Sequence, residues 1–112
     1  MSGKYNIQML QGETFCRELR WQNAAGSTVD IQGYTAKMQI RDATTRDLII
    51  ELSTENNRIV ITTDNKIQLI IKAVDTTNLN FVNGIYDLEI YKGDDAKRIA
   101  QGTVKLNLEV TK

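Results

Sequence analysis

Apolar and polar residues alternate with a period of two along most of this 112-residue sequence. Such a period places successive side chains on opposite faces of a β-strand. The clearest run spans residues 34–41, where Tyr34, Ala36 and Met38 share one face and polar side chains share the other. Residues 100–111 repeat this pattern. Both segments are therefore predicted to be strands with one buried and one wet face.

Six shorter segments rich in Ile, Leu, Val and aromatic residues complete the predicted set of strands: residues 5–10, 14–22, 48–53, 58–62, 66–72 and 85–92. Turn-forming residues separate several of them, and residues 92–95 (K-G-D-D) predict a hairpin before the last strand. Turn signals that recur about every 8–12 residues are typical of a sandwich or barrel. The sequence thus predicts an all-β fold.

Residues 74–79 form the one segment that favours a helical turn, because Asp75 is placed to accept hydrogen bonds from backbone amides. The segment is predicted to be a crossover between two sheets, with Leu79 and Phe81 capping the core. Tyr86 follows it. One hypothesis makes Tyr86 a corner tyrosine that ties this connection to the next strand, and the alternative is plain core packing.

The alternation also assigns side chains to faces. Trp21 is expected at the edge of the core rather than on an aromatic platform for sugar. Tyr91 shares its face with Asp87 and Glu89, so it is expected to point outward and is a candidate partner contact. The expected core residues are Phe15, Leu19, Trp21, Ile31, Tyr34, Met38, Ile40, Tyr86, Leu88 and Ile90.

The chain contains no histidine, and this excludes Ser-His-Asp and Cys-His nucleophile activation as well as His-bearing zinc sites. Carboxylates are scattered, and the seven glycines form no phosphate-binding loop. Asp64-Asn65 and Asp94-Asp95 could offer oxygen ligands to calcium, but neither has the dense ladder of acids that a calcium loop supplies. Cys16 is expected to be a plain strand residue. We therefore expect no enzyme activity, no cofactor and no metal site.

Charge and length constrain the partners. Fourteen Lys and Arg balance fourteen Asp and Glu, so no basic surplus favours nucleic acid. No run of 18 apolar residues predicts a membrane span, and residues 1–112 are expected to form a single domain. The sequence also lacks proline, a common device for protecting sheet edges. Unprotected edges and zero net charge favour a domain that lies inside an assembly.

Several short pieces occur in a set order along nearly the whole chain, beginning with G-E-T-F at residues 12–15 and L-R-W-Q-N at residues 19–23. They continue with residues 29–41, 86–90, 102–104 and 109–111. Together they resemble a family of small tailed-bacteriophage virion proteins and the amino-terminal domain of phage upper baseplate proteins.

This resemblance implies an immunoglobulin-like β-sandwich. Together with the strands and the crossover segment above, it leads us to expect an antiparallel sandwich of seven or eight strands with one short helical crossover. It also implies a non-catalytic structural part of the virion, in the tail, baseplate or neck or as capsid cement. The expected partners are other virion proteins and further copies of the chain, without nucleic acid, membrane or small-molecule substrate. The chain would be made in the host bacterial cytoplasm and reside in the virion. The alternative is a carbohydrate-binding or adhesin-like sandwich.

Overall fold

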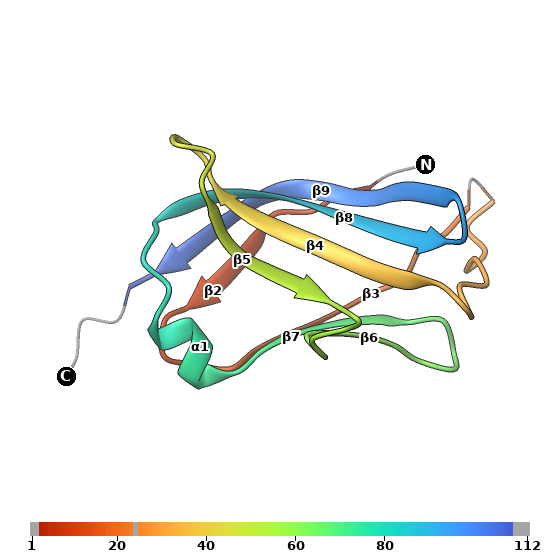
Figure 1. Cartoon of the computed structure of the whole chain (residues 1–112), viewed down its shortest axis with the longest axis horizontal. Coiled ribbons are helices and arrows are strands. Elements are labelled where there is room, and N and C mark those ends of the chain that lie inside the picture. The colour runs from red at the N-terminus through yellow and green to blue at the C-terminus, as the bar shows by residue number, and fades with distance from the viewer. Residues whose placement is uncertain (1–2, 24, 109–112) are drawn as a thin grey trace.

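The computed structural model describes residues 3–23 and 25–108 of the chain. Within these residues, nine strands and one short helix form two sheets that pack face to face (Figure 1). The molecule is elongated, with principal dimensions of 45 × 26 × 26 Å. The predicted all-β sandwich is confirmed. Residues 109–111, the end of the predicted last strand, lie outside the described residues.

The larger sheet has the strand order β1-β9-β8-β4-β5, and β2 also pairs with β9. Its outer strands therefore come from the amino-terminal segment on one side and from the middle of the chain on the other. The strands are β1 (Gly3–Lys4), β2 (Ile7–Leu10), β4 (Thr35–Asp42), β5 (Leu48–Ser53), β8 (Asn83–Lys92) and β9 (Asp95–Asn107).

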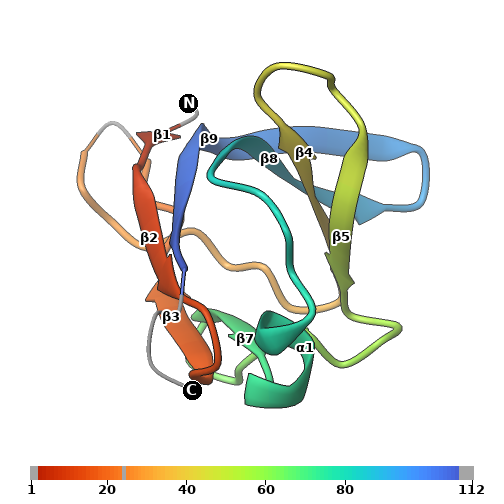
Figure 2. The same cartoon turned by 90° about the vertical axis from the view of Figure 1, so that its left-hand side faces the viewer.

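The smaller sheet contains β3 (Phe15–Leu19), β6 (Ile59–Ile61) and β7 (Ile67–Ile71) in the order β3-β7-β6. Helix α1 (Ala73–Thr77) connects β7 to β8, so the chain crosses from the smaller to the larger sheet as predicted (Figure 2). Leu79 and Phe81 follow the helix and are buried.

The predicted capping role of Asp75 is wrong. The helix begins after Lys72, with no side-chain hydrogen bond at its N-cap. Asp75 lies inside the first turn instead, where its Oδ2 accepts a hydrogen bond from Arg58 Nη2 at 3.2 Å. The buried Thr76 hydroxyl anchors the helix by donating to the carbonyl oxygen of Glu13 at 2.8 Å. Tertiary contacts thus hold this short helix in place.

The core lies between the sheets and consists mainly of Ile, Leu and Met side chains from the inner strand faces. Burial of these apolar faces is the main driving force for the two-layer arrangement. Among the residues expected in the core, the buried ones are Ile31, Met38, Ile40, Tyr86, Leu88 and Ile90. The remaining four, Phe15, Leu19, Trp21 and Tyr34, are half-buried and pack against the cluster.

The amino-terminal segment differs from the expectation of purely antiparallel pairing. Both β1 and β2 run parallel to β9, with Lys4 opposite Gln101 and Ile7 opposite Val104. Pairing is interrupted at Tyr5 and Asn6, which explains why the one predicted strand over residues 5–10 is divided into two. Counted as one interrupted strand, this segment gives eight strands in the described part of the chain.

Contacts of Gly102 and Tyr86 with the Tyr5 carbonyl determine where this interruption lies. The Tyr86 hydroxyl donates a hydrogen bond of 2.8 Å to the carbonyl oxygen of Tyr5, 81 residues away in the sequence. A Cβ atom on Gly102 would overlap that same carbonyl group and lie 3.2 Å from Cε1 of Tyr86. The corner-tyrosine hypothesis is therefore wrong, because the hydroxyl binds the amino-terminal segment instead of its own connection.

Strand β9 begins five residues before the predicted run. The hairpin at residues 92–95 is present, with Lys92 opposite Asp95. The register then shifts between Leu88 and Glu89, and both Ile99 and Ala100 are buried. A bulge of this kind breaks the period of two, so the alternation becomes regular only from Ala100 onward.

We predict that Gly102→Ala destabilises the protein by about 1–3 kcal/mol, because the added methyl group must displace the Tyr5 carbonyl. Urea unfolding measures the loss, and hydrogen exchange should show reduced protection of the Tyr5 and Ile7 amides. Gly26→Ala is the control: Gly26 has φ +85° and open space around it, so the substitution costs about 1 kcal/mol of backbone strain. Unchanged exchange in Gly102→Ala would contradict this account.

Candidate docking surface

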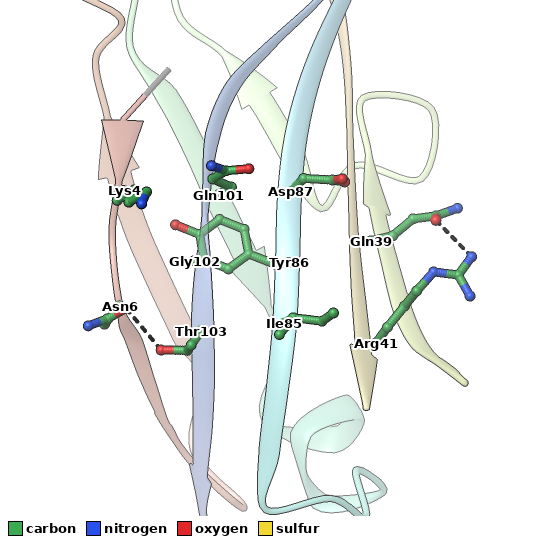
Figure 3. A pocket seen from close by; sticks show the side chains of 10 residues that line it. All are labelled: Lys4, Asn6, Gln39, Arg41, Ile85, Tyr86, Asp87, Gln101, Gly102 and Thr103. Carbon is green, nitrogen blue, oxygen red and sulfur yellow. Dashed lines mark hydrogen bonds between the residues drawn. The ribbon is translucent and has the colours of Figure 1, made fainter. Parts of the chain in front are cut away.

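The outer face of the larger sheet contains a hollow of about 500 Å³ (Figure 3). Strands β4, β8 and β9 supply most of its lining, and the amino-terminal segment supplies one wall. The lining residues are Lys4, Asn6, Gln39, Arg41, Ile85, Tyr86, Asp87, Gln101, Gly102 and Thr103. We call this hollow and its lining the outer hollow.

Strand alternation explains why these side chains gather. In β8, Gly84, Tyr86 and Leu88 are buried, so Ile85 and Asp87 face outward. Neighbouring strands add their outward residues in register: Ile85 lies between Arg41 and Thr103 across the sheet, and Asp87 lies between Gln39 and Gln101. The outer hollow therefore has an apolar centre at Ile85, surrounded by polar side chains.

A chain of hydrogen bonds holds one wall in place. Arg41 Nη2 donates to Gln39 Oε1 at 3.0 Å, and Gln39 Nε2 donates to Glu51 Oε2 at 2.9 Å. Arg41 Nη1 also donates to the carbonyl oxygen of Arg46 at 3.0 Å. These bonds fix the amide of Gln39 and the guanidinium group of Arg41 before any partner binds.

The turn between β4 and β5 presents the Arg46 carbonyl to Arg41. Asp42 Oδ1 accepts hydrogen bonds from the amides of Thr44 at 2.8 Å and Thr45 at 3.0 Å. The same two amides lower the pKa of Asp42, because they stabilise its carboxylate. Arg46 closes the turn with φ 69°. The local sequence of the turn thus determines the position of a side chain in the outer hollow.

The opposite wall is polar as well. The Thr103 hydroxyl donates to Asn6 Oδ1 at 2.9 Å, which joins β9 to the amino-terminal segment (Figure 3). Asp87 forms an exposed ion pair with Arg98 at 3.6 Å, and such pairs add little stability. The surface therefore presents two cations, Lys4 and Arg41, with one carboxylate at Asp87.

Tyr86 lies beneath this surface, and Figure 3 shows its ring reaching from β8 toward Gly102 on β9. Burial raises the pKa of the Tyr86 phenol to about 12, although the positive charge of Arg17 opposes the shift. Tyr86 is 4% exposed, so its ring supports the outer hollow from below and offers little surface to a partner.

The sequence-predicted partner contact, Tyr91, lies outside the outer hollow. It is half-buried, and its hydroxyl donates to Glu89 Oε1 at 3.0 Å. Burial raises its pKa, and the hydrogen bond to Glu89 adds to the shift. Trp21 lies on another side of the molecule, half-buried, with Lys97 Nζ 5.5 Å from its ring centroid. Of the expected core residues, Tyr86 alone lines the outer hollow.

Sequence reasoning missed the polar members of the surface. Gln39, Arg41, Gln101 and Thr103 belong to the wet faces of the two clearest alternating runs, and Asp87 was noted only as a neighbour of Tyr91. No motif joins them. Their proximity depends on the pairing of β4, β8 and β9, and single strands do not reveal that pairing.

Among residues 3–23 and 25–108, no three His, Cys, Asp or Glu side chains gather closely enough to hold a metal ion. Cys16 is an exposed free thiol on β3. In the same part of the chain, no helix is long and apolar enough to cross a membrane.

The sheet order and the crossover define an immunoglobulin-like β-sandwich, and one solved structure supports this class. A marsupial T cell receptor aligns with a TM-score of 0.52 at 10% identity, over 96% of this chain and 51% of the receptor chain. The chain thus spans about half the length of that receptor chain. At this identity the similarity concerns the fold alone, and the predicted immunoglobulin-like fold is confirmed.

A second solved structure is the extracellular fragment of novel immune-type receptor 11 from Ictalurus punctatus, which includes the stalk region. It aligns with a TM-score of 0.42 and 14% identity, over 100% of this chain and 88% of the fragment. No family model matches the sequence, and no curated protein matches it.

We predict that the protein loses stability as the pH rises from about 10 to about 12. The unfolded chain ionises Tyr86 near its ordinary pKa of 10.0, whereas the folded protein keeps it protonated until about pH 12. The Tyr86 contribution, up to about 3 kcal/mol, is present below pH 10 and is lost across this range. Urea unfolding at several pH values measures it.

Tyr86→Phe is the control for this pH dependence. The variant lacks the ionising group and should show a shallower decline, while the smaller contribution of Tyr91 remains. Equal loss of stability in both proteins between pH 10 and 12 would contradict the assignment to Tyr86.

Proposed function

We propose that the chain is a non-catalytic structural component of a tailed-phage virion that docks through its outer hollow. The particle setting comes from the resemblance of its ordered sequence pieces to small virion proteins and to the amino-terminal domain of upper baseplate proteins. Its partners would be other virion proteins and further copies of the chain, and its place would be the tail, the baseplate, the neck or the capsid surface.

The observation that supports docking is the fixed arrangement of polar groups around Ile85. Protein interfaces combine an apolar centre with a polar rim, and the outer hollow has this composition. Gln39, Arg41 and Thr103 are already held by hydrogen bonds within the chain. Binding would therefore order few additional side chains, which lowers the entropic cost of association.

Carbohydrate binding is the second candidate function, and the same surface favours it. A volume of about 500 Å³ lies within the range of small-ligand sites, and amide, guanidinium and carboxylate groups are suited to sugar hydroxyls. The aromatic part is weaker, because Tyr86 is the one aromatic residue in the described lining and it is buried.

Thr103→Trp tests docking, because it should fill the outer hollow from an exposed strand position. We expect normal melting and at least about a tenfold loss of incorporation into particles. Lys105→Trp is the matched control: it lies two residues further along β9, is also exposed and does not line the outer hollow. Mass spectrometry of purified particles, with filled heads separated from detached tails, measures incorporation.

Three outcomes contradict docking in a particle through this surface. The chain is absent from both fractions, Thr103→Trp is incorporated as well as Lys105→Trp, or a monomer in solution binds a glycan whose affinity Thr103→Trp abolishes. The third result would favour the carbohydrate-binding alternative.

A further inference from the structure

Among the described residues, strand β3 has one edge without a partner strand. In the part of the chain that the structure describes, β3 pairs only with β7, while β1 and β2 both pair with β9 in the other sheet. The edge of β5 is partly closed, because the Glu51 carbonyl accepts hydrogen bonds from Asn56 Nδ2 at 3.0 Å and Arg58 Nη1 at 3.2 Å. An open strand edge is a template for a strand from another chain.

A partly apolar groove of about 210 Å³ lies where β3 ends at Leu19 and the chain continues through Arg20 and Trp21. Its rim includes Leu19, Arg20 and Trp21, and its floor reaches the core side chains Ile67 and Leu88. Leu19 and Trp21 turn inward and are half-buried, whereas Arg20 between them is exposed. A complementary strand would have apolar residues at two alternate positions and a carboxylate between them.

The sequence of this chain contains such a segment. Residues 108–112 read L-E-V-T-K, a sequence that in a strand would put Leu108 and Val110 on one face and Glu109 on the other. Leu108 is 49% exposed, which is high for a leucine that follows a strand. Antiparallel addition with Glu109 opposite Arg20 would place Leu108 opposite Trp21 and Val110 opposite Leu19.

Leu108 is too far from Trp21 of its own chain to lie opposite it. Trp21 and Ala100 line the same groove, so the groove lies near the middle of β9. Asn107 is seven residues further along β9, and a strand advances about 3.3 Å per residue, so Leu108 lies roughly 25 Å away from the groove. The Asn107 carbonyl is held by the amide of Gln11 at the far end of the sheet. The segment therefore fits the groove of a second copy.

We propose that residues 108–112 of one copy add as a strand to another copy, along the edge formed by β3 and the two residues that follow it, with Glu109 opposite Arg20. The contact joins two different surfaces, so it links copies head to tail instead of closing a symmetric dimer. Symmetric pairing of two β3 strands centred on Arg17 or Glu18 would oppose like charges. The inference deepens the proposed function, and its setting in a particle rests on that function.

Charge reversal in the full-length chain tests the contact. Wild-type protein should self-associate with rising concentration in sedimentation equilibrium. Arg20→Glu and Glu109→Arg should each weaken association about tenfold, and the double variant should recover most of it. Lys37→Glu, on the outer face of the other sheet, is the control and should change nothing.

The proposed register also predicts the effect of changing the charge at Lys112. It places Lys112 opposite Arg17, a like-charge pair, so Lys112→Glu should strengthen association. A wild-type protein that stays monomeric at all concentrations would overturn the proposal. So would single charge reversals that the double variant does not rescue.

Disulfide trapping tests the register directly. In a Cys16→Ser background the protein has no other cysteine, so Glu18→Cys and Thr111→Cys can be placed in separate chains and mixed. We expect the mixed disulfide to exceed either homodimer, because the register makes these residues direct cross-strand neighbours.

Lys37→Cys mixed with Thr111→Cys is the control for chance collisions. A mixed disulfide no more abundant than in this control would overturn the proposal. Both experiments use purified protein without particles, so their failure is distinguishable from failure of the proposed function, which is measured by incorporation of Thr103→Trp.

Discussion

The hydrogen bond from the Tyr86 hydroxyl to the Tyr5 carbonyl, together with the missing side chain at Gly102, is the constraint on which both surfaces of this protein depend. It holds the amino-terminal segment in parallel register along β9. That register places Lys4 and Asn6 at a wall of the outer hollow. It also commits the segment to the larger sheet, so β3 keeps an open edge in the described part of the chain. This single hydrogen bond therefore affects both the outer hollow on the larger sheet and the edge of β3 in the smaller sheet.

The charged side chains of this neutral chain act mainly by orienting neighbouring polar side chains through hydrogen bonds. The ion pair between Asp87 and Arg98 is exposed and stabilises the fold little, whereas the bonds from Arg41 to Gln39 fix a surface that a partner can contact. Arg17 breaks the alternation of β3, and its positive charge acts on the Tyr86 phenol. An inward charge on an edge strand is a known way to discourage unspecific pairing, so the open edge is selective in what it accepts.

The sequence predicted the strands well because alternation depends on local burial, and Met38 and Ile40 are buried where the pattern placed them. The sequence did not predict features that depend on contacts between segments far apart in the chain. The direction of the amino-terminal strand depends on Tyr86, and the early start of β9 is masked by the bulge that buries both Ile99 and Ala100. The outer hollow was missed for the same reason, because its members become neighbours only through pairing of β4, β8 and β9.

The two proposed contacts are geometrically compatible. Strand addition would use the edge of the smaller sheet in one copy and residues 108–112 in the next, and neither contributes to the lining of the outer hollow. Each copy in a head-to-tail row would therefore keep its outer hollow free for a different partner. A symmetric dimer through the outer hollow would instead cover that surface and end the assembly at two copies. In the proposed arrangement a row would grow through the edge and attach through the face, and these two surfaces lie on different sheets.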